Sequence, residues 1–285
     1  MLKMKKAAEM VGEKVEGKST LLYGAPKTGK TYSLDDPDLE VHLIDFDGGS
    51  AVLEGAPRVT IWELTKDLAT VQSKEEHPYY LYCQLKEGFR RGYIDIDGQR
   101  IDLSNVDLVV IDSFSRFQDI VKDFVAKYYA PKRAREIQGR FGAMSDWGDL
   151  QDIEIFEAKD WHTMTKRGDK SINVMWIAHS EYEQENGLNV STKIALQGKY
   201  APMQIMSIMD AVFYSFKVAV EENGKQVVKY GIYTQTTGIN QAEVRYNKRS
   251  KRLPAVIQNP VWSKIFKHLG YKLKSEKPEA QEVKQ

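Results

Sequence analysis

Short apolar segments alternate with amphipathic segments through the first two thirds of the chain. Runs typical of buried strands lie at 20–23, 40–46, 58–63, 106–114 and 172–179. Apolar residues at helical spacing follow at 77–91, 117–129 and 145–165. In the last of these, Leu150, Ile153, Phe156 and Trp161 would face inward. This alternation predicts an α/β fold with a mostly parallel sheet and helices on both faces.

Three turn dipeptides add hairpins to this pattern. They are Asp97-Gly98 within 93–103, Asn186-Gly187 within 181–194, and Asn223-Gly224 between the segments 212–220 and 227–235. Asp-Gly and Asn-Gly favour the two-residue turns that join antiparallel strands. The first hairpin reads as an inserted β-ribbon, and the later two would extend one edge of the sheet antiparallel.

The pattern divides the chain into four parts. Residues 1–17 form an N-terminal strap that includes an amphipathic helix with Val11 and Val15 four apart, and residues 18–255 form the core. A closing helix occupies 256–271. Residues 272–285 are charged and almost without apolar side chains, which predicts a disordered tail.

Composition narrows the setting and the partners. The chain has 41 basic and 40 acidic residues, so contact with nucleic acid would need local patches. Cys83 is the lone cysteine and excludes an intramolecular disulfide, as expected in a reducing compartment. No apolar run reaches the ~18 residues of a membrane span, and no signal peptide opens the chain. We expect a cytoplasmic protein without a membrane partner.

The segment GAPKTGKT follows the first apolar run and has the G-x-x-x-x-G-K-T spacing of a phosphate-binding loop. Glycines at both ends let successive backbone N–H groups point at a phosphate, and a helix starting near Gly29 would add its dipole. This helix should be short, because Asp35-Asp36-Pro37 ends it. Lys30 can reach the β- and γ-phosphates, and Thr31 can bind Mg²⁺. A chance match is expected in on the order of one per cent of such chains. The nucleotide-binding residues would be Gly24, Ala25, Pro26, Lys27, Thr28, Gly29, Lys30 and Thr31.

Three polar residues at strand ends complete a candidate site. Asp112 closes the strongest apolar run, where a carboxylate can hold Mg²⁺ together with Thr31; otherwise it caps the next turn. Asp45 and Asp47 alternate at the end of the second run, so one of them can face the site. We favour Asp47 as the group that orients or deprotonates water, against a simple turn aspartate. His179 ends the last apolar run. It either senses the γ-phosphate or is an ordinary hydrogen-bonded histidine at a strand end.

Two clusters of basic residues either form ordinary solvated surface or contact phosphate groups. The first, Lys132, Arg133, Arg135 and Arg140, is a candidate for contact with DNA. The second lies in EVRYNKRSKRLP, and its members Arg245, Lys248 and Arg249, like the separate Lys199, are candidates for a finger that reaches a neighbouring subunit's γ-phosphate.

The order of these motifs resembles the RecA-like P-loop ATPases. LLYGAPKTGKT, HLIDFDGG, LVVIDSFSRF, VMWIAHSE and ALQGKYAPMQIMSIMDAVFYSF are most similar to the compact bacteriophage ATPases of the Sak type, which act in single-strand annealing and recombination. The resemblance implies that Asp47 activates water, where many relatives have glutamate, and that His179 is the switch residue. It also implies that 180–202 matches a loop that contacts single-stranded DNA.

The function expected from the sequence is an ATPase that uses ATP and Mg²⁺, acts on single-stranded DNA in phage-type recombination or replication, and self-associates with ATP at subunit interfaces. Its cytoplasm would be that of a bacterial host if the chain is phage-encoded. Lys30, Asp47 and His179 would be the catalytic residues. Two alternatives stay open: a nucleotide-dependent assembly module with little turnover, and a P-loop kinase with the basic 131–140 segment as its lid.

Overall fold

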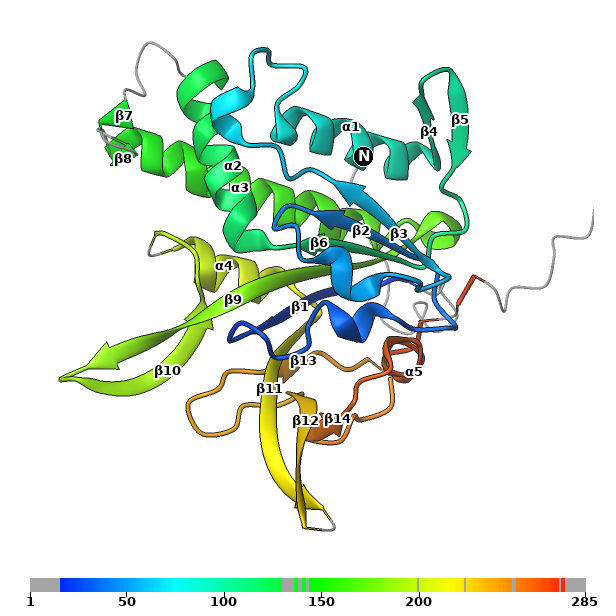
Figure 1. Ribbon diagram of the computed structural model, residues 1–285, viewed down its shortest axis with the longest axis vertical. Helices are drawn as coiled ribbons and strands as arrows, with labels where there is room; N and C mark the ends of the chain where they lie inside the picture. The colour runs from blue at the N-terminus through cyan, green and yellow to red at the C-terminus, as the bar shows by residue number, and fades with distance from the viewer. Residues whose placement is uncertain are drawn as a thin grey trace, which may run out of the picture.

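The computed structural model describes residues 16–129, 136–137, 140–141, 144–198, 200–222, 224–247, 250–271 and 273–274. Within them, a ten-stranded sheet forms the centre of the molecule (Figure 1). Its parallel part has the spatial order β11 (Ala211–Glu222), β1 (Ser19–Gly24), β9 (Asn173–Glu185), β6 (Leu108–Asp112), β2 (Val41–Asp45) and β3 (Val59–Glu63). β12 (Lys225–Tyr233), β14 (Val256–Gln258) and β13 (Glu243–Val244) continue the sheet antiparallel beyond or beside β11, and β10 (Leu188–Ile194) pairs with β9.

The place of β9 in this order positions the site. β9 lies between β1 and β6, so that Gly24 is paired with His179 and Asp112 with Ile177. β1, β2 and β6 are buried along their whole length because both faces of the sheet are covered. The carboxyl ends of these parallel strands therefore meet at one edge of the sheet.

Helices cover the two faces unequally (Figure 1). One face packs against α1 (Pro78–Arg91), α2 (Phe114–Phe124), α3 (Met144–Met164) and α4 (Ala201–Ile208). The other face packs against α5 (Trp262–His268) and the short 3-10 helices η2 (Tyr32–Leu34) and η3 (Ser50–Leu53). The closing helix predicted over 256–271 is therefore shorter than expected, because residues 256–258 pair with β12 as strand β14. The predicted fold class, a mostly parallel sheet flanked by helices with antiparallel hairpins, is confirmed.

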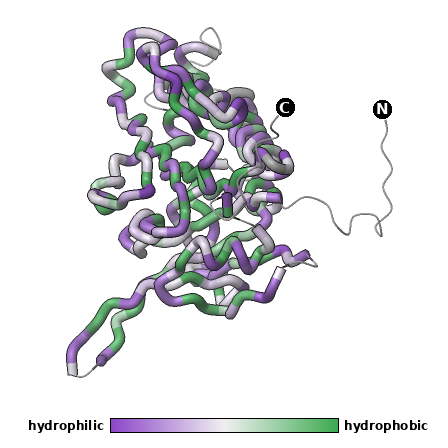
Figure 2. The backbone as a smooth tube through the Cα atoms, turned by 90° about the vertical axis from the view of Figure 1, so that its right-hand side faces the viewer, coloured by the Kyte–Doolittle hydropathy of each residue, from purple (hydrophilic) through white to green (hydrophobic). Residues whose placement is uncertain are grey.

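The hairpins form where the turn dipeptides predict them. β4 (Tyr93–Ile96) and β5 (Gln99–Asp102) make a separate two-stranded sheet, and Asp97 and Gly98 both have positive φ. Asn186 and Gly187 turn β9 into β10 with the same backbone geometry. The prediction that this hairpin extends an edge of the sheet is wrong, because β10 pairs with β9, a central strand. The β11–β12 hairpin projects from the lower end of the molecule, where apolar and polar residues intermingle, whereas apolar residues concentrate in the centre (Figure 2).

The inward face of α3 differs from the prediction at one position. Leu150 and Trp161 are buried as expected, but Phe156 is 61% exposed. Glu157 is buried instead, where it accepts hydrogen bonds from Tyr82 at 2.8 Å and Lys86 at 2.6 Å. Helical periodicity identified Phe156 as an inward residue because it cannot recognise a buried carboxylate whose partners lie on α1.

Short elements complete the described chain. They are η4 (Leu68–Thr70), the π-helical turn η5 (Val125–Tyr129), η6 (Gly168–Lys170), and the small pair β7 (Glu136–Ile137) and β8 (Arg140–Phe141). The predictions for 1–15, for most of the 272–285 tail and for Lys132, Arg133 and Arg135 lie outside the described residues. None of the helices that the structure describes is long and apolar enough to cross a membrane.

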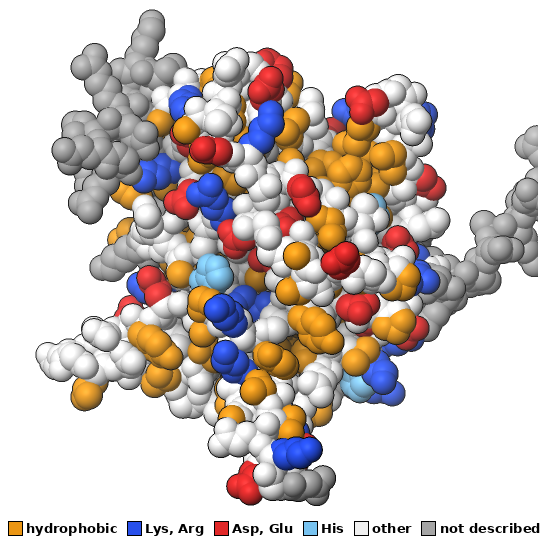
Figure 3. Space-filling view, viewed as in Figure 1, with side chains coloured by type: hydrophobic (Ala, Val, Ile, Leu, Met, Phe, Trp, Pro, Cys, Tyr) orange, Lys and Arg blue, Asp and Glu red, His pale blue; other side chains and the backbone are white. Residues whose placement is uncertain are grey.

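The surface mixes charges of both signs on the face of Figure 3. An apolar patch lies where β3, α1 and the β4–β5 hairpin meet, beside a cavity of about 710 Å³. Figure 3 shows no large field of a single sign, as the near-neutral composition suggests.

Candidate functional site

The loop Gly24–Thr31 leaves the buried end of β1 and curls at the edge of the sheet. A side chain at Gly24 would place its Cβ 2.3 Å from the carbonyl oxygen of Ser215, and Gly29 has a φ of +81°. Lys30 is buried, and its Nζ donates to the carbonyl oxygens of Gly24 at 3.0 Å and Ala25 at 2.9 Å. Burial lowers the pKa of Lys30 to about 8, against the opposing effect of Asp112 and Asp47.

The short helix predicted after this loop ends where expected but is a 3-10 turn, not an α-helix. Only the three-residue 3-10 helix η2 follows Thr31, and the chain turns away at Asp35. Asp36 accepts backbone hydrogen bonds from Asp38 and from Ser263 of α5, and Pro37 cannot extend a helix. A bound phosphate would therefore be held by the loop amides and Lys30, with little contribution from a helix dipole.

Thr31 and Asp112 lie together although 81 residues separate them. The Thr31 hydroxyl donates to Asp112 Oδ2 at 2.6 Å. Burial, together with the nearby carboxylates Asp47 and Asp45, raises the pKa of Asp112 to about 6 against the opposing effect of the Thr31 hydrogen bond. A hydroxyl and a carboxylate in this negative field suit Mg²⁺, which prefers oxygen ligands and keeps several waters. The described residues contain no group of three or more His, Cys, Asp or Glu side chains that could hold a metal ion.

Asp45, the last residue of β2, and Asp47, in the turn after it, make different contacts. The Asp45 carboxylate accepts backbone hydrogen bonds from Asp47, Gly48 and Ser50 at 2.8–3.0 Å and so holds the turn in place. Asp47 is aimed at the site, and its Oδ2 lies 3.7 Å from His179 Nε2. Burial opposes ionisation of Asp47, but hydrogen bonds from His179 and Ser113 lower its pKa below the usual value.

His179 stands between the loop and the Asp112 strand. It is paired in register with Gly24, and its backbone N–H faces the Ser115 hydroxyl at 3.4 Å. Among the described residues its buried Nδ1 has no hydrogen-bond partner. A side chain here is placed to contact Asp47 and the end of the phosphate loop together.

Among the remaining candidates, Arg245 does not join this edge of the sheet. The Arg245 backbone N–H donates to Asp210, whose own N–H donates to Ser19 at the opposite end of β1. Lys199, Lys248, Arg249 and the side chain of Arg140 lie outside the described residues. The segment expected to contact DNA is an ordered hairpin with exposed Glu181, Glu183 and Glu185, and Lys193 pairs with Glu181 at 3.3 Å.

A cavity of about 380 Å³ beside the loop was not foreseen from the sequence. Thr28, Gly29 and Tyr32 line one side, and Tyr230 of β12 and Asn259 line the other. A Cβ on Gly29 would lie 2.9 Å from the Tyr230 ring, so the loop and this ring are in close contact. Tyr230 is some 200 residues from the loop in sequence, and only the antiparallel edge of the sheet brings it there.

Comparison with known proteins adds one finding. A family model described as an AAA domain, a type of P-loop ATPase, matches residues 16–246 and so includes the loop, Asp112 and His179. A search of curated proteins found no match.

Proposed function

Because the chain belongs to the AAA-domain family of P-loop ATPases, we propose that it hydrolyses ATP with Mg²⁺ at the edge of the sheet formed by β1, β2, β6 and β9. One observation carries the proposal. The phosphate loop, the Thr31–Asp112 pair and the Asp47–His179 pair converge at the carboxyl ends of neighbouring parallel strands.

Each residue of this edge has a task in phosphoryl transfer. The loop amides and Lys30 bind the phosphates and stabilise the charge that develops on the γ-phosphoryl group. Thr31 and Asp112 would hold Mg²⁺, which when bound neutralises phosphate oxygens. Asp47, kept ionised by His179, orients water for in-line attack. His179 senses whether the γ-phosphate is present, because it contacts both Asp47 and the strand end that carries the loop.

The cavity beside the loop is proposed to bind the base. It adjoins Gly29, where a nucleotide on the loop would extend, and it offers aromatic rings from Tyr32 and Tyr230. Asp35 and the Asn259 amide line the same cavity and supply polar groups for the base edge.

From the basic clusters in the sequence, we also propose that the protein binds single-stranded DNA and self-associates in a recombination-type reaction. Arg245 lies at the opposite end of β1 from its own loop, so it could act as a finger only in a neighbour's site. A module with little turnover is the alternative, because the short Asp47 side chain holds water less closely than glutamate would.

The test measures ATP binding and phosphate release with and without single-stranded DNA, beside the mass of the assembly. Lys30→Ala is expected to lower turnover on the order of 10²-fold or more, as loss of a charge-stabilising donor does. The exposed Lys66→Ala is the matched control and should keep full turnover. Full activity of Lys30→Ala would refute the site. Tight binding without phosphate release would favour the low-turnover module, and indifference to DNA and to protein concentration would remove the recombination role.

A further inference from the structure

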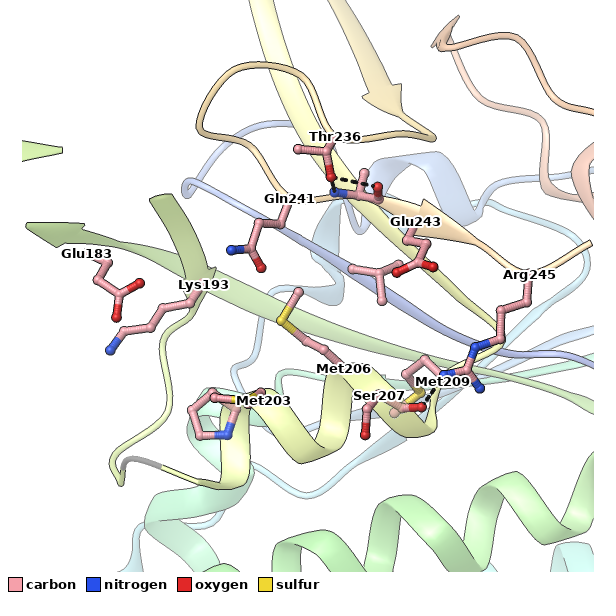
Figure 4. A pocket seen from close by; sticks show the side chains of 13 residues that line it. Glu183, Lys193, Met203, Met206, Ser207, Met209, Thr236, Gln241, Glu243 and Arg245 are labelled. Carbon is pink, nitrogen blue, oxygen red and sulfur yellow. Dashed lines mark hydrogen bonds between the residues drawn. The ribbon is translucent and has the colours of Figure 1, made fainter. Parts of the chain in front are cut away.

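A groove lined by methionines lies on the α4 side of the sheet, away from the phosphate loop. Its volume is about 630 Å³, and Met203, Met206 and Met209 contribute to its lining between α4 and β13. Figure 4 shows Glu183 and Lys193 at one end of the groove and Arg245 at the other. Met203 is 70% exposed. Flexible methionine side chains adapt to the apolar face of a helix, which makes such a groove a docking surface.

The N-terminal residues reach the core at the Arg245 end of this groove. Glu16 pairs with Lys166 at 3.7 Å, and Lys166 pairs at 3.0 Å with Asp210, the residue after Met209. Burial lowers the pKa of His162, and both Glu16 and Arg245 are close enough to influence it. The described chain therefore begins beside the groove, and residues 1–15 precede it in the sequence. As a helix they would span about 22 Å, longer than the eight-residue α4.

The sequence of this segment matches the groove in apolar pattern and in charge. Met4, Ala7, Val11 and Val15 recur at helical spacing and would share one face. Three of its four lysines lie at the far end of the segment, at positions 3, 5 and 6, and the fourth, Lys14, lies at the near end. With residue 15 at the Arg245 end, the lysines at positions 3, 5 and 6 would reach the end where Glu183 lies (Figure 4). Glu181 and Glu185 are exposed on the same strand, β9.

We propose that residues 1–15 form an amphipathic helix that lies in the methionine groove of the same chain. The apolar face covers the methionines, and Lys3, Lys5 and Lys6 meet the hairpin glutamates. The segment then ties α4 to the hairpin that continues from His179. This assignment does not depend on the proposed ATPase activity.

Engineered cysteines test the docking in the full-length chain. With Cys83→Ala as background, Ala7→Cys and Met203→Cys are combined, because residue 7 would lie about two turns from residue 15 and so opposite the start of α4. The control combines Ala7→Cys with Val52→Cys, an exposed residue of η3 on the other face of the sheet. Mild oxidation with glutathione disulfide is followed by mass and by gel mobility.

The groove pair is expected to form a disulfide within one chain roughly ten-fold or more faster than the control pair, because docking raises the effective concentration of the two thiols. Adding Val11→Asp should remove this advantage, since the apolar face is broken while the described core is untouched. Equal rates for the two pairs would overturn the proposal. A disulfide that joins two chains would also overturn it and would assign the groove to a second copy.

Discussion

Two carboxylates that are two positions apart have opposite roles at the scale of single residues. Asp47→Asn should leave unfolding and nucleotide affinity nearly unchanged but lower kcat by about 10²- to 10⁴-fold, the usual contribution of a general base. Asp45→Asn should instead destabilise the fold by about 1–3 kcal/mol, because its carboxylate satisfies three backbone N–H groups. Urea unfolding and single-turnover hydrolysis separate the two effects. Normal turnover by Asp47→Asn would exclude it as the water-orienting group.

Tyr230 gives a second test, at the base cavity. Tyr230→Ala should weaken ATP binding by about ten-fold or more, since stacking on a base contributes about 1–3 kcal/mol. Tripolyphosphate carries no base, so its affinity should stay the same. Tyr230→Phe keeps the ring and should bind ATP normally. Calorimetric titration of both ligands is the measurement, and an equal loss for ATP and tripolyphosphate would mean that the variant distorts Gly29 rather than removing a base contact.

These residues show how far the sequence could define the site. The phosphate loop could be recognised from the sequence because its chemistry requires a fixed residue spacing. Asp112 could be recognised because it closes a strongly apolar strand. We expected Asp45 and Asp47 to lie on opposite faces, but strand periodicity places residues two positions apart on the same face. The turn after Asp45 is what aims the two carboxylates differently. Tyr230 had no local signal, because its place depends on the pairing of β11 with β12.

At the scale of elements, the buried strands could be predicted from their apolar runs. The hairpins could be predicted because Asn-Gly and Asp-Gly suit the backbone geometry of their turns. The 3-10 form of the helix after the loop and the inward face of α3 could not be predicted in this way. Asp36 bonds to distant backbone, and Glu157 is buried with Lys86 of α1 as partner. Both outcomes depend on tertiary contacts that override a local pattern.

The junction of α2, α3 and the chain after β10 carries a prediction of pH dependence. Gln118 of α2 donates to Glu154 of α3 at 2.6 Å and exchanges two hydrogen bonds with the Gln197 backbone. Burial raises the pKa of Glu154 to about 8 against the Gln118 hydrogen bond. Between its ordinary value and pH 8 the folded carboxyl keeps a proton that the unfolded chain releases, so stability falls as pH rises.

Glu154→Gln removes this titration and keeps an oxygen that accepts from Gln118. The variant should match the unaltered chain near pH 5 and gain stability toward pH 8, by up to about 1.4 kcal/mol per pH unit of the interval. Urea unfolding at several pH values measures the difference. For the exposed Glu75→Gln control, the difference in free energy of unfolding from the unaltered chain should not change with pH. If the same were found for Glu154→Gln, the Glu154 carboxyl would ionise normally.

At the scale of the whole molecule, the site is assembled from segments that span the chain from Gly24 to Asn259. No part of it exists in the unfolded chain, so a ligand that binds there must stabilise the global fold. At a concentration of about 100 times Kd, ATP with Mg²⁺ should raise the free energy of unfolding by about 2.7 kcal/mol. Chelating Mg²⁺ with EDTA should reduce this gain, because the charge on the phosphates is then less neutralised.

Asp112→Asn tests which residue carries the Mg²⁺ dependence. The amide oxygen can still accept from Thr31, but the carboxylate that would hold the cation is gone. ATP should therefore stabilise the Asp112→Asn variant equally with Mg²⁺ and with EDTA. The gain should be close to the gain of the unaltered chain in EDTA. Thermal unfolding of both chains under the four conditions makes the comparison. If the variant kept the full Mg²⁺-dependent gain, the cation would be held elsewhere, and the pairing of Thr31 with Asp112 would serve only to close β6 against the loop.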